Sequence, residues 1–254
     1  MDMTRVIEQI KQAHMNSSDP PPDYKCNLCH DNGWIESRDE NGIRFVKKCA
    51  CQIARESEEK LKRSGLEQAL TSKTFETFKV ETDVQRMLQK AAKDFLDAYM
   101  TEEKKPWLYI GGNPGSGKTH VCTALCGELL KKNIGVRYMQ WVVEARRLKA
   151  AVNDEEFEDL IEDYVNVPVL YIDDLLKQKY TENPVFTDAD IKIAFSILDR
   201  RTLQNKATII STEWDLFKQL LAADEGAFSR VFERCKNHTV YVPRNPRNNY
   251  RLTN

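Results

Sequence analysis

Near the middle of the chain the sequence reads Gly112-Asn113-Pro114-Gly115-Ser116-Gly117-Lys118-Thr119. This octapeptide fits G-x-x-x-x-G-K-[ST], the loop that wraps the phosphates of a nucleoside triphosphate. A short apolar run rich in β-forming residues precedes it at 107–110, and apolar residues at helical spacing follow it over 121–132. Strand, glycine-rich loop and helix are the context that the motif requires. We therefore predict a binding site for ATP or GTP rather than a glycine-rich turn that matches by chance.

The residue types of this loop each suit phosphate binding. Glycines let the backbone turn its N–H groups inward, and the N-terminus of the following helix adds partial positive charge. Lys118 is expected to reach the β- and γ-phosphates, and Thr119 to offer its hydroxyl to Mg²⁺. The predicted nucleotide-binding residues of the loop are Gly112, Asn113, Pro114, Gly115, Ser116, Gly117, Lys118 and Thr119.

A second motif follows the loop by about 55 residues, the order of spacing found in P-loop proteins. The apolar run at 167–172 ends in Asp173-Asp174, the Walker B pattern. A buried parallel strand delivers its last residues to the carboxyl edge of the sheet, where the phosphates lie. Asp173 is expected to hold Mg²⁺ together with Thr119, and Asp174 to orient the attacking water, so that these two acids and Lys118 are the predicted catalytic groups.

The composition fits an α/β protein, and the length allows one large domain, alone or with a small appendage. The chain has 254 residues, of which 41% are apolar, and no run of about 18 apolar residues that would span a membrane. Its first residues show no export signal, and its net charge of −1 gives no general attraction to nucleic acid. Seven cysteines at uneven spacing favour a reducing, cytoplasmic location.

Changes in composition divide the chain into three parts. Residues 1–23 read as a short amphipathic helix, at 4–15, and a proline-rich linker. Residues 24–67 form a cysteine-rich module, and residues 68–254 the nucleotide-binding domain. At the start of that domain Phe75 and Phe78 are expected to pack against its core.

The cysteine-rich module carries two close pairs, Cys26 with Cys29 and Cys49 with Cys51. They flank a predicted β-hairpin with Asn41-Gly42 at its turn. Four thiolates suit tetrahedral Zn²⁺, and so small a segment has too little core to hold itself together otherwise. We therefore predict a structural zinc site. The second pair is C-x-C, tighter than C-x-x-C, so His30 remains an alternative ligand, and unliganded thiols or a redox pair remain alternative interpretations.

Taken together, several motifs resemble the AAA+ helicase loaders of the DnaC/DnaI type. They are Gly117-Lys118-Thr119-His120, Asp173-Asp174, Phe228-Ser229-Arg230 and Asn249-Tyr250-Arg251. The cysteine-rich module is similar to that of loaders from Gram-positive bacteria and their phages. The resemblance implies an AAA+ P-loop ATPase, with a parallel sheet flanked by helices. It also implies a function: ATP-dependent delivery of the replicative hexameric helicase onto single-stranded DNA.

The resemblance also assigns roles to individual residues. Arg230 would be an arginine finger that reaches the ATP of a neighbouring subunit, which implies self-association through the ATP sites; Arg234, one helical turn further on, is the second choice. Arg251 would contact ATP from its own subunit, together with His120. The first sensor falls on Ser211, Thr212 or Glu213, with Thr212 taken as the nucleotide contact, although the family most often has Asn there. Arg146, Arg147 and Lys149 would contact the phosphates of single-stranded DNA.

Two other functions compete with the loader. A transposition helper ATPase shares the motor, but its resemblance is mainly to the ATPase half. A small-molecule kinase on the same scaffold would need an acceptor pocket and a mobile lid with arginines.

Overall fold

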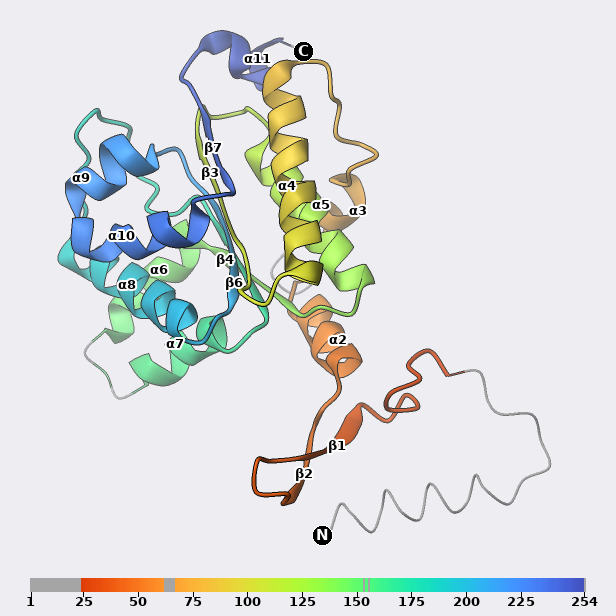
Figure 1. Cartoon of the computed structure of the whole chain (residues 1–254). Helices are drawn as coiled ribbons and strands as arrows, with labels where there is room; N and C mark the ends of the chain where they lie inside the picture. The colour runs from red at the N-terminus through yellow and green to blue at the C-terminus, as the bar shows by residue number, and fades with distance from the viewer. Residues whose placement is uncertain (1–23, 62–66, 153, 155, 254) are drawn as a thin grey trace.

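The computed structural model describes residues 24–61, 67–152, 154 and 156–253 (Figure 1). The helix predicted at 4–15 and the linker after it lie outside these residues. Among the helices that the structure describes, none is both long and apolar enough to cross a bilayer.

The large domain is built on one five-stranded parallel sheet with the strand order β4-β5-β6-β3-β7. Its strands are β3 (Trp107–Gly112), β4 (Val136–Gln140), β5 (Val169–Asp173), β6 (Ala207–Ser211) and β7 (Thr239–Val242). Strands β3, β5 and β6 are buried throughout, because helices cover both faces of the sheet. The order places β6 between the strand that precedes the phosphate loop and the strand that ends in Asp173. The predicted α/β fold is confirmed.

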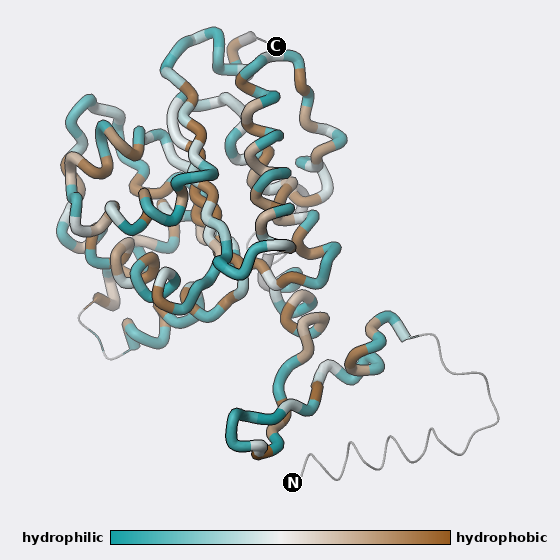
Figure 2. The backbone as a smooth tube through the Cα atoms, in the orientation of Figure 1, coloured by the Kyte–Doolittle hydropathy of each residue, from teal (hydrophilic) through white to brown (hydrophobic). Residues whose placement is uncertain are grey.

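Helices form a layer on each face of this sheet (Figure 1). One layer contains α3 (Glu67–Ser72), α4 (Asp83–Thr101) and α5 (Lys118–Lys131). The other contains α6 (Trp141–Ala151), α7 (Phe157–Val165), α8 (Asp188–Leu203), the π-helical turn η2 (Leu216–Leu220), α9 (Leu221–Ala223) and α10 (Glu225–Cys235). Two apolar clusters fill the spaces between the sheet and its two helix layers. Phe75 and Phe78 pack, as expected, into the cluster on the side of α4 and α5. Figure 2 shows the hydrophobic residues concentrated along the strands and the inner helix faces.

One buried cation ties α8 to the sheet. The Arg201 guanidinium is fully buried and donates to the carbonyls of Tyr164, Val165, Val167 and Ala207. Burial lowers the pKa of Arg201 to about 9. Its hydrogen bonds replace the water that this charge would otherwise need.

The cysteine-rich module is an antiparallel hairpin followed by a helix: β1 (Trp34–Arg38), β2 (Arg44–Lys48) and α2 (Ala50–Leu61). Helix α2 packs against the start of β4, where a Cβ on Gly135 would lie 2.6 Å from a methyl carbon of Ile53. The module therefore contacts the edge of the sheet where the strands begin, below the sheet in Figure 1. The phosphate loop lies at the opposite edge, where the strands end.

Candidate ATP site and cysteine cluster

The phosphate loop connects the end of β3 to α5, which begins at Lys118. Gly115 and Gly117 have φ angles of 72° and 95°, a region that side chains with a Cβ disfavour. A Cβ on Gly117 would also lie 2.9 Å from the ring of Phe78, so the residue must be small. The loop borders a cavity of about 210 Å³ whose wall includes Lys73, Pro114, Gly115, Gly117, Lys118, Thr119, His120, Asp174, Lys177, Glu213 and Arg251.

Lys118 is buried at the base of this cavity. Its ammonium donates to the carbonyls of Gly112 and Asn113 at 2.9 and 2.8 Å. Burial lowers the pKa of Lys118 to about 8, because desolvation disfavours the charged form. The side chain is thus held at the loop, at the place where a phosphate oxygen would be its natural partner.

Asp173 ends β5 and accepts hydrogen bonds from four hydroxyl groups. They come from Tyr171 at 2.8 Å, Thr119 and Tyr138 at 3.1 Å each, and Ser211. Two oxygen ligands at right angles on Mg²⁺ are about 3.0 Å apart, so the Thr119 hydroxyl and the Asp173 carboxylate fit one magnesium ion. Tyr138 and Tyr171 were not predicted from the sequence as partners of Asp173. The signal available for Tyr171 was its position two residues before Asp173, on the same side of the strand.

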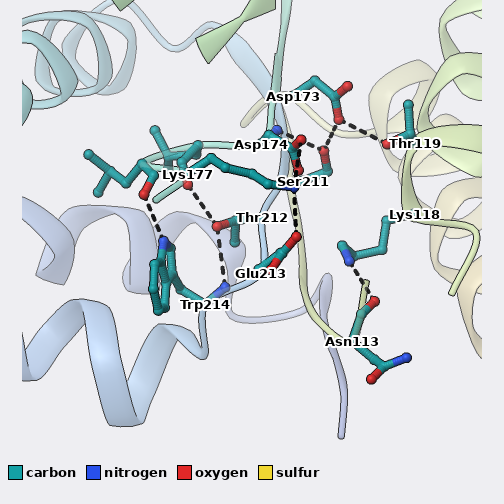
Figure 3. A network of polar contacts seen from close by, with 12 residues as sticks. Asn113, Lys118, Thr119, Asp173, Asp174, Lys177, Ser211, Thr212, Glu213 and Trp214 are labelled. Atoms are coloured by element: carbon teal, nitrogen blue, oxygen red, sulfur yellow. Dashed lines mark hydrogen bonds and ion pairs between the residues drawn. The ribbon is translucent and has the colours of Figure 1, made fainter. Parts of the chain in front are cut away.

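Asp174 follows at the cavity wall with two further charged groups (Figure 3). Lys177 donates to the Asp174 carboxylate at 3.1 Å and to the Glu213 carboxylate at 2.6 Å. Burial, and next the nearby charge of Asp173, raise the pKa of Asp174. Lys177 had no role predicted from the sequence.

Of the three sensor candidates, the structure turns Ser211 and Glu213 toward the site and Thr212 away from it. Side chains alternate in direction along an extended chain, and Ser211 and Glu213 are two residues apart. The Thr212 hydroxyl is buried and donates to the Leu175 carbonyl at 2.8 Å. Thr212 does not line the cavity and Glu213 does, which corrects the expectation that Thr212 contacts the nucleotide.

The C-terminal segment folds back over the phosphate loop. After η3 (Pro246–Asn248), the short helix α11 (Tyr250–Thr253) begins with Tyr250, whose backbone N–H donates to the Gly115 carbonyl at 3.1 Å. Arg251 thereby reaches the cavity of its own subunit. His120 lies at the same cavity, with Nε2 3.1 Å from the Thr74 carbonyl oxygen, and burial lowers its pKa.

The two arginines proposed as a finger differ in their surroundings. Arg230 on α10 is 46% exposed, pairs with Asp199 and does not line the cavity of its own subunit. Arg234 instead is buried and donates to the Lys105 carbonyl at 2.6 Å and to Asn205 at 3.2 Å. Of the two arginines, Arg230 is therefore the one that is open to solvent.

The basic residues of α6 are mixed in their environment. Lys149 pairs with Asp190 at 2.7 Å, and Arg147 lies 3.9 Å from Glu144. Arg146 is exposed on the same helix.

The four predicted cysteines meet in one place. The sulfur atoms of Cys26, Cys29, Cys49 and Cys51 all lie within 4.8 Å of one another. Two of the distances are 3.7 Å (Cys26 to Cys49) and 3.4 Å (Cys29 to Cys51), close to the edge of about 3.8 Å of a tetrahedron with Zn–S bonds of 2.3 Å. The donor set therefore fits Zn²⁺.

Helix α2 explains how a C-x-C pair serves such a site. Cys49 directly precedes the helix and Cys51 lies in its first turn, so the change of backbone direction brings both sulfurs together. The helix N-terminus and Arg55, whose guanidinium donates to the Cys51 sulfur at 3.3 Å, both favour thiolates. His30 stacks on Tyr24 and is outside the four-residue group.

The family described as IstB-like ATP binding protein matches residues 44–254. The chain belongs to this family. The match includes the phosphate loop, both acids and the C-terminal segment, and the family is described as ATP-binding.

Named relatives of this IstB-like chain come from bacteria. The phage-like element PBSX protein XkdC of Bacillus subtilis is 28% identical over 86% of this chain and 82% of that protein. The replicative helicase loader DnaI of the same organism is 25% identical over 70% of this chain and 59% of that protein. The crystal structure of DnaI has the same fold, with a TM-score of 0.56 at 21% identity over 69% of this chain and 92% of that chain.

Proposed function

We propose that this protein is an ATP-dependent loader that delivers a replicative hexameric helicase onto single-stranded DNA. Relatives named replicative helicase loaders, from Bacillus subtilis and Escherichia coli, support the role. The observation that carries the mechanism is the separation of Arg230 from the rest of the ATP site. Lys118, Asp174 and Arg251 lie at one cavity and Asp173 bonds to Thr119 in its wall, whereas Arg230 is exposed on α10.

In this proposal each subunit binds ATP and its neighbour completes the hydrolytic site. The loop amides and Lys118 bind the phosphates. Thr119 and Asp173 would hold Mg²⁺, and the ion would neutralise phosphate charge. Asp174 orients the attacking water, and Arg230 of the adjacent subunit stabilises charge on the transferring phosphoryl group. The mechanism makes hydrolysis depend on assembly, which suits a protein whose output is the placement of a ring.

DNA contact is assigned to α6. Arg146 and Arg147 are the stronger phosphate contacts, because Lys149 is already paired with Asp190. Binding through them would be independent of sequence and sensitive to salt.

The transposition helper is the alternative that uses the same ATP site. The relatives named loaders favour the first role. The cysteine module also speaks for it, because the helper resemblance is mainly to the ATPase half. A small-molecule kinase is distinguished by its products, because it would transfer the phosphoryl group to an acceptor other than water.

The test is helicase loading with the purified protein. A replicative hexamer recovered from a candidate host would be offered circular single-stranded DNA coated with single-strand binding protein. We expect loading to require this protein and ATP, and to fail with Lys118→Ala. A protein that turns over ATP but neither binds nor loads the helicase, and instead associates with a transposase, would refute the proposal in favour of the helper.

A further inference from the structure

Lys177 lines the phosphate cavity together with Lys73 and Lys118. It lies outside both the phosphate loop and the Asp173-Asp174 motif. Its ammonium bridges Asp174 and Glu213, at 3.1 and 2.6 Å, in the wall of the phosphate cavity (Figure 3). The end of the cavity at Asp174 is the γ-phosphate end, because Asp174 directly follows the proposed magnesium ligand and shares the cavity wall with Lys118, the lysine of the loop. Lys177 is 37% exposed, so its long side chain has room to move.

The backbone that carries Lys177 is fixed in an unfavourable conformation. Asp174 and Leu176 have φ angles of 57° and 56°, the left-handed region that non-glycine residues rarely adopt. Three hydrogen bonds from the end of β6 and the residues after it hold this segment in place. They join the Leu175 N–H to the Ser211 carbonyl, the Thr212 hydroxyl to the Leu175 carbonyl, and the Trp214 indole to the Leu176 carbonyl. Such conformations persist where the surrounding structure enforces them and are concentrated at functional sites.

The two carboxylates that Lys177 bridges differ in what else neutralises them. Glu213 also accepts from Arg244 at 3.2 Å, and the Arg244 guanidinium lies 3.4 Å from the centre of the Tyr180 ring. For Asp174, Lys177 is the cation that the described part of the chain places at ion-pair distance. Withdrawal of Lys177 would therefore leave Glu213 paired and Asp174 free.

We propose that Lys177 is a γ-phosphate sensor that exchanges Asp174 for the terminal phosphate of bound ATP. In the nucleotide-free protein the lysine holds Asp174 in an ion pair. A γ-phosphate at this end of the cavity offers the ammonium a more highly charged partner, and Asp174 is then released to orient water. ADP lacks that phosphate and leaves the ion pair in place. This inference rests on ATP binding at the cavity and not on the helicase-loading role.

The test compares affinities for a non-hydrolysable ATP analogue and for ADP. Lys177→Gln should weaken analogue binding by about tenfold, the worth of one charge-assisted hydrogen bond partly offset by the lost ion pairs. Its affinity for ADP should stay within about twofold, because the α- and β-phosphates do not use Lys177. Retained ADP binding also shows that the variant is folded. Lys177→Arg should recover most of the discrimination, since it keeps the charge.

The matched control is Lys179→Gln, an exposed lysine two residues further along the same segment. It removes the same net charge and should change neither affinity. If Lys177→Gln weakens the binding of the ATP analogue and of ADP equally, the proposal is overturned, and Lys177 has only a general charge effect on the cavity. No change with either nucleotide would equally overturn it, leaving a surface ion pair. Both results can be read whether or not the protein loads a helicase.

Discussion

Two arginines one helical turn apart on α10 should give opposite phenotypes when replaced by Ala. Arg230 is 46% exposed and paired with a partly exposed carboxylate, so its removal should cost at most about 1 kcal/mol of folding stability. Arg234 is buried and donates two hydrogen bonds, so its loss should cost about 2–3 kcal/mol. For a domain of this size that is a fall in Tm of about 4–12 °C for Arg234→Ala, against less than about 4 °C for Arg230→Ala.

Activity should follow the reverse order for the same two variants. A finger supplied by the neighbour acts in the transition state, so Arg230→Ala should bind ATP normally yet hydrolyse it about 10³-fold more slowly. The assays are nucleotide binding by fluorescence, steady-state release of phosphate at saturating ATP, and thermal unfolding. They are run below the unfolding transition of Arg234→Ala.

Mixing variants tests whether the site is shared between subunits. Asp173→Ala lacks a proposed magnesium ligand but retains Arg230, and Arg230→Ala has the converse defect. A mixture can form composite sites with an intact cavity from one chain and an intact arginine from the other, so turnover should exceed the sum of the separate variants. Absence of any gain, at concentrations where the wild-type chains associate, would refute hydrolysis between subunits.

Three further predictions concern metal, DNA and pH. Elemental analysis should find about one Zn²⁺ per chain, and Cys49→Ser should unfold the cysteine module while nucleotide binding persists; zinc-free protein with four freely titrating thiols would contradict this. Joint replacement of Arg146, Arg147 and Lys149 by Ala should weaken the binding of single-stranded DNA of every sequence. The slope of the logarithm of the binding constant against the logarithm of salt concentration should fall by about 0.7 for each phosphate that the variant no longer neutralises. An unchanged slope would indicate a solvated helix face. Phosphate binding should raise the pKa of Lys118 above the value of about 8 that it has in the nucleotide-free protein. ATP affinity should therefore be constant below pH 8 and fall as the pH rises above it. Titration calorimetry from pH 7 to about 9.5 would measure this.

Sequence alone was sufficient where the determinants are local. The phosphate loop, its flanking strand and helix, and the strand ending in Asp173 are encoded by glycine positions and hydrophobic periodicity within short windows. The four cysteines were also identifiable, because two close pairs of thiols around a hairpin turn match the ligand set of tetrahedral Zn²⁺. These features predicted the α/β class and the fit to Mg²⁺ and Zn²⁺.

The pairing of segments far apart in the chain decided which side chains meet at the ATP site. The place of β6 between β3 and β5 brings Ser211 to Asp173 and Glu213 to Lys177, and no periodicity within one segment specifies which strands are neighbours. The phase of alternation beyond β6 sends Thr212 into the interior and Glu213 to the cavity, and a shift of one residue would reverse them. Likewise Arg230 and Arg234 look alike in sequence, and only the packing of α10 buries one and exposes the other. Local sequence patterns thus determined which chemical groups the chain contains. Long-range packing determined which of these side chains take part in the site, because their partners come from segments far apart in the chain.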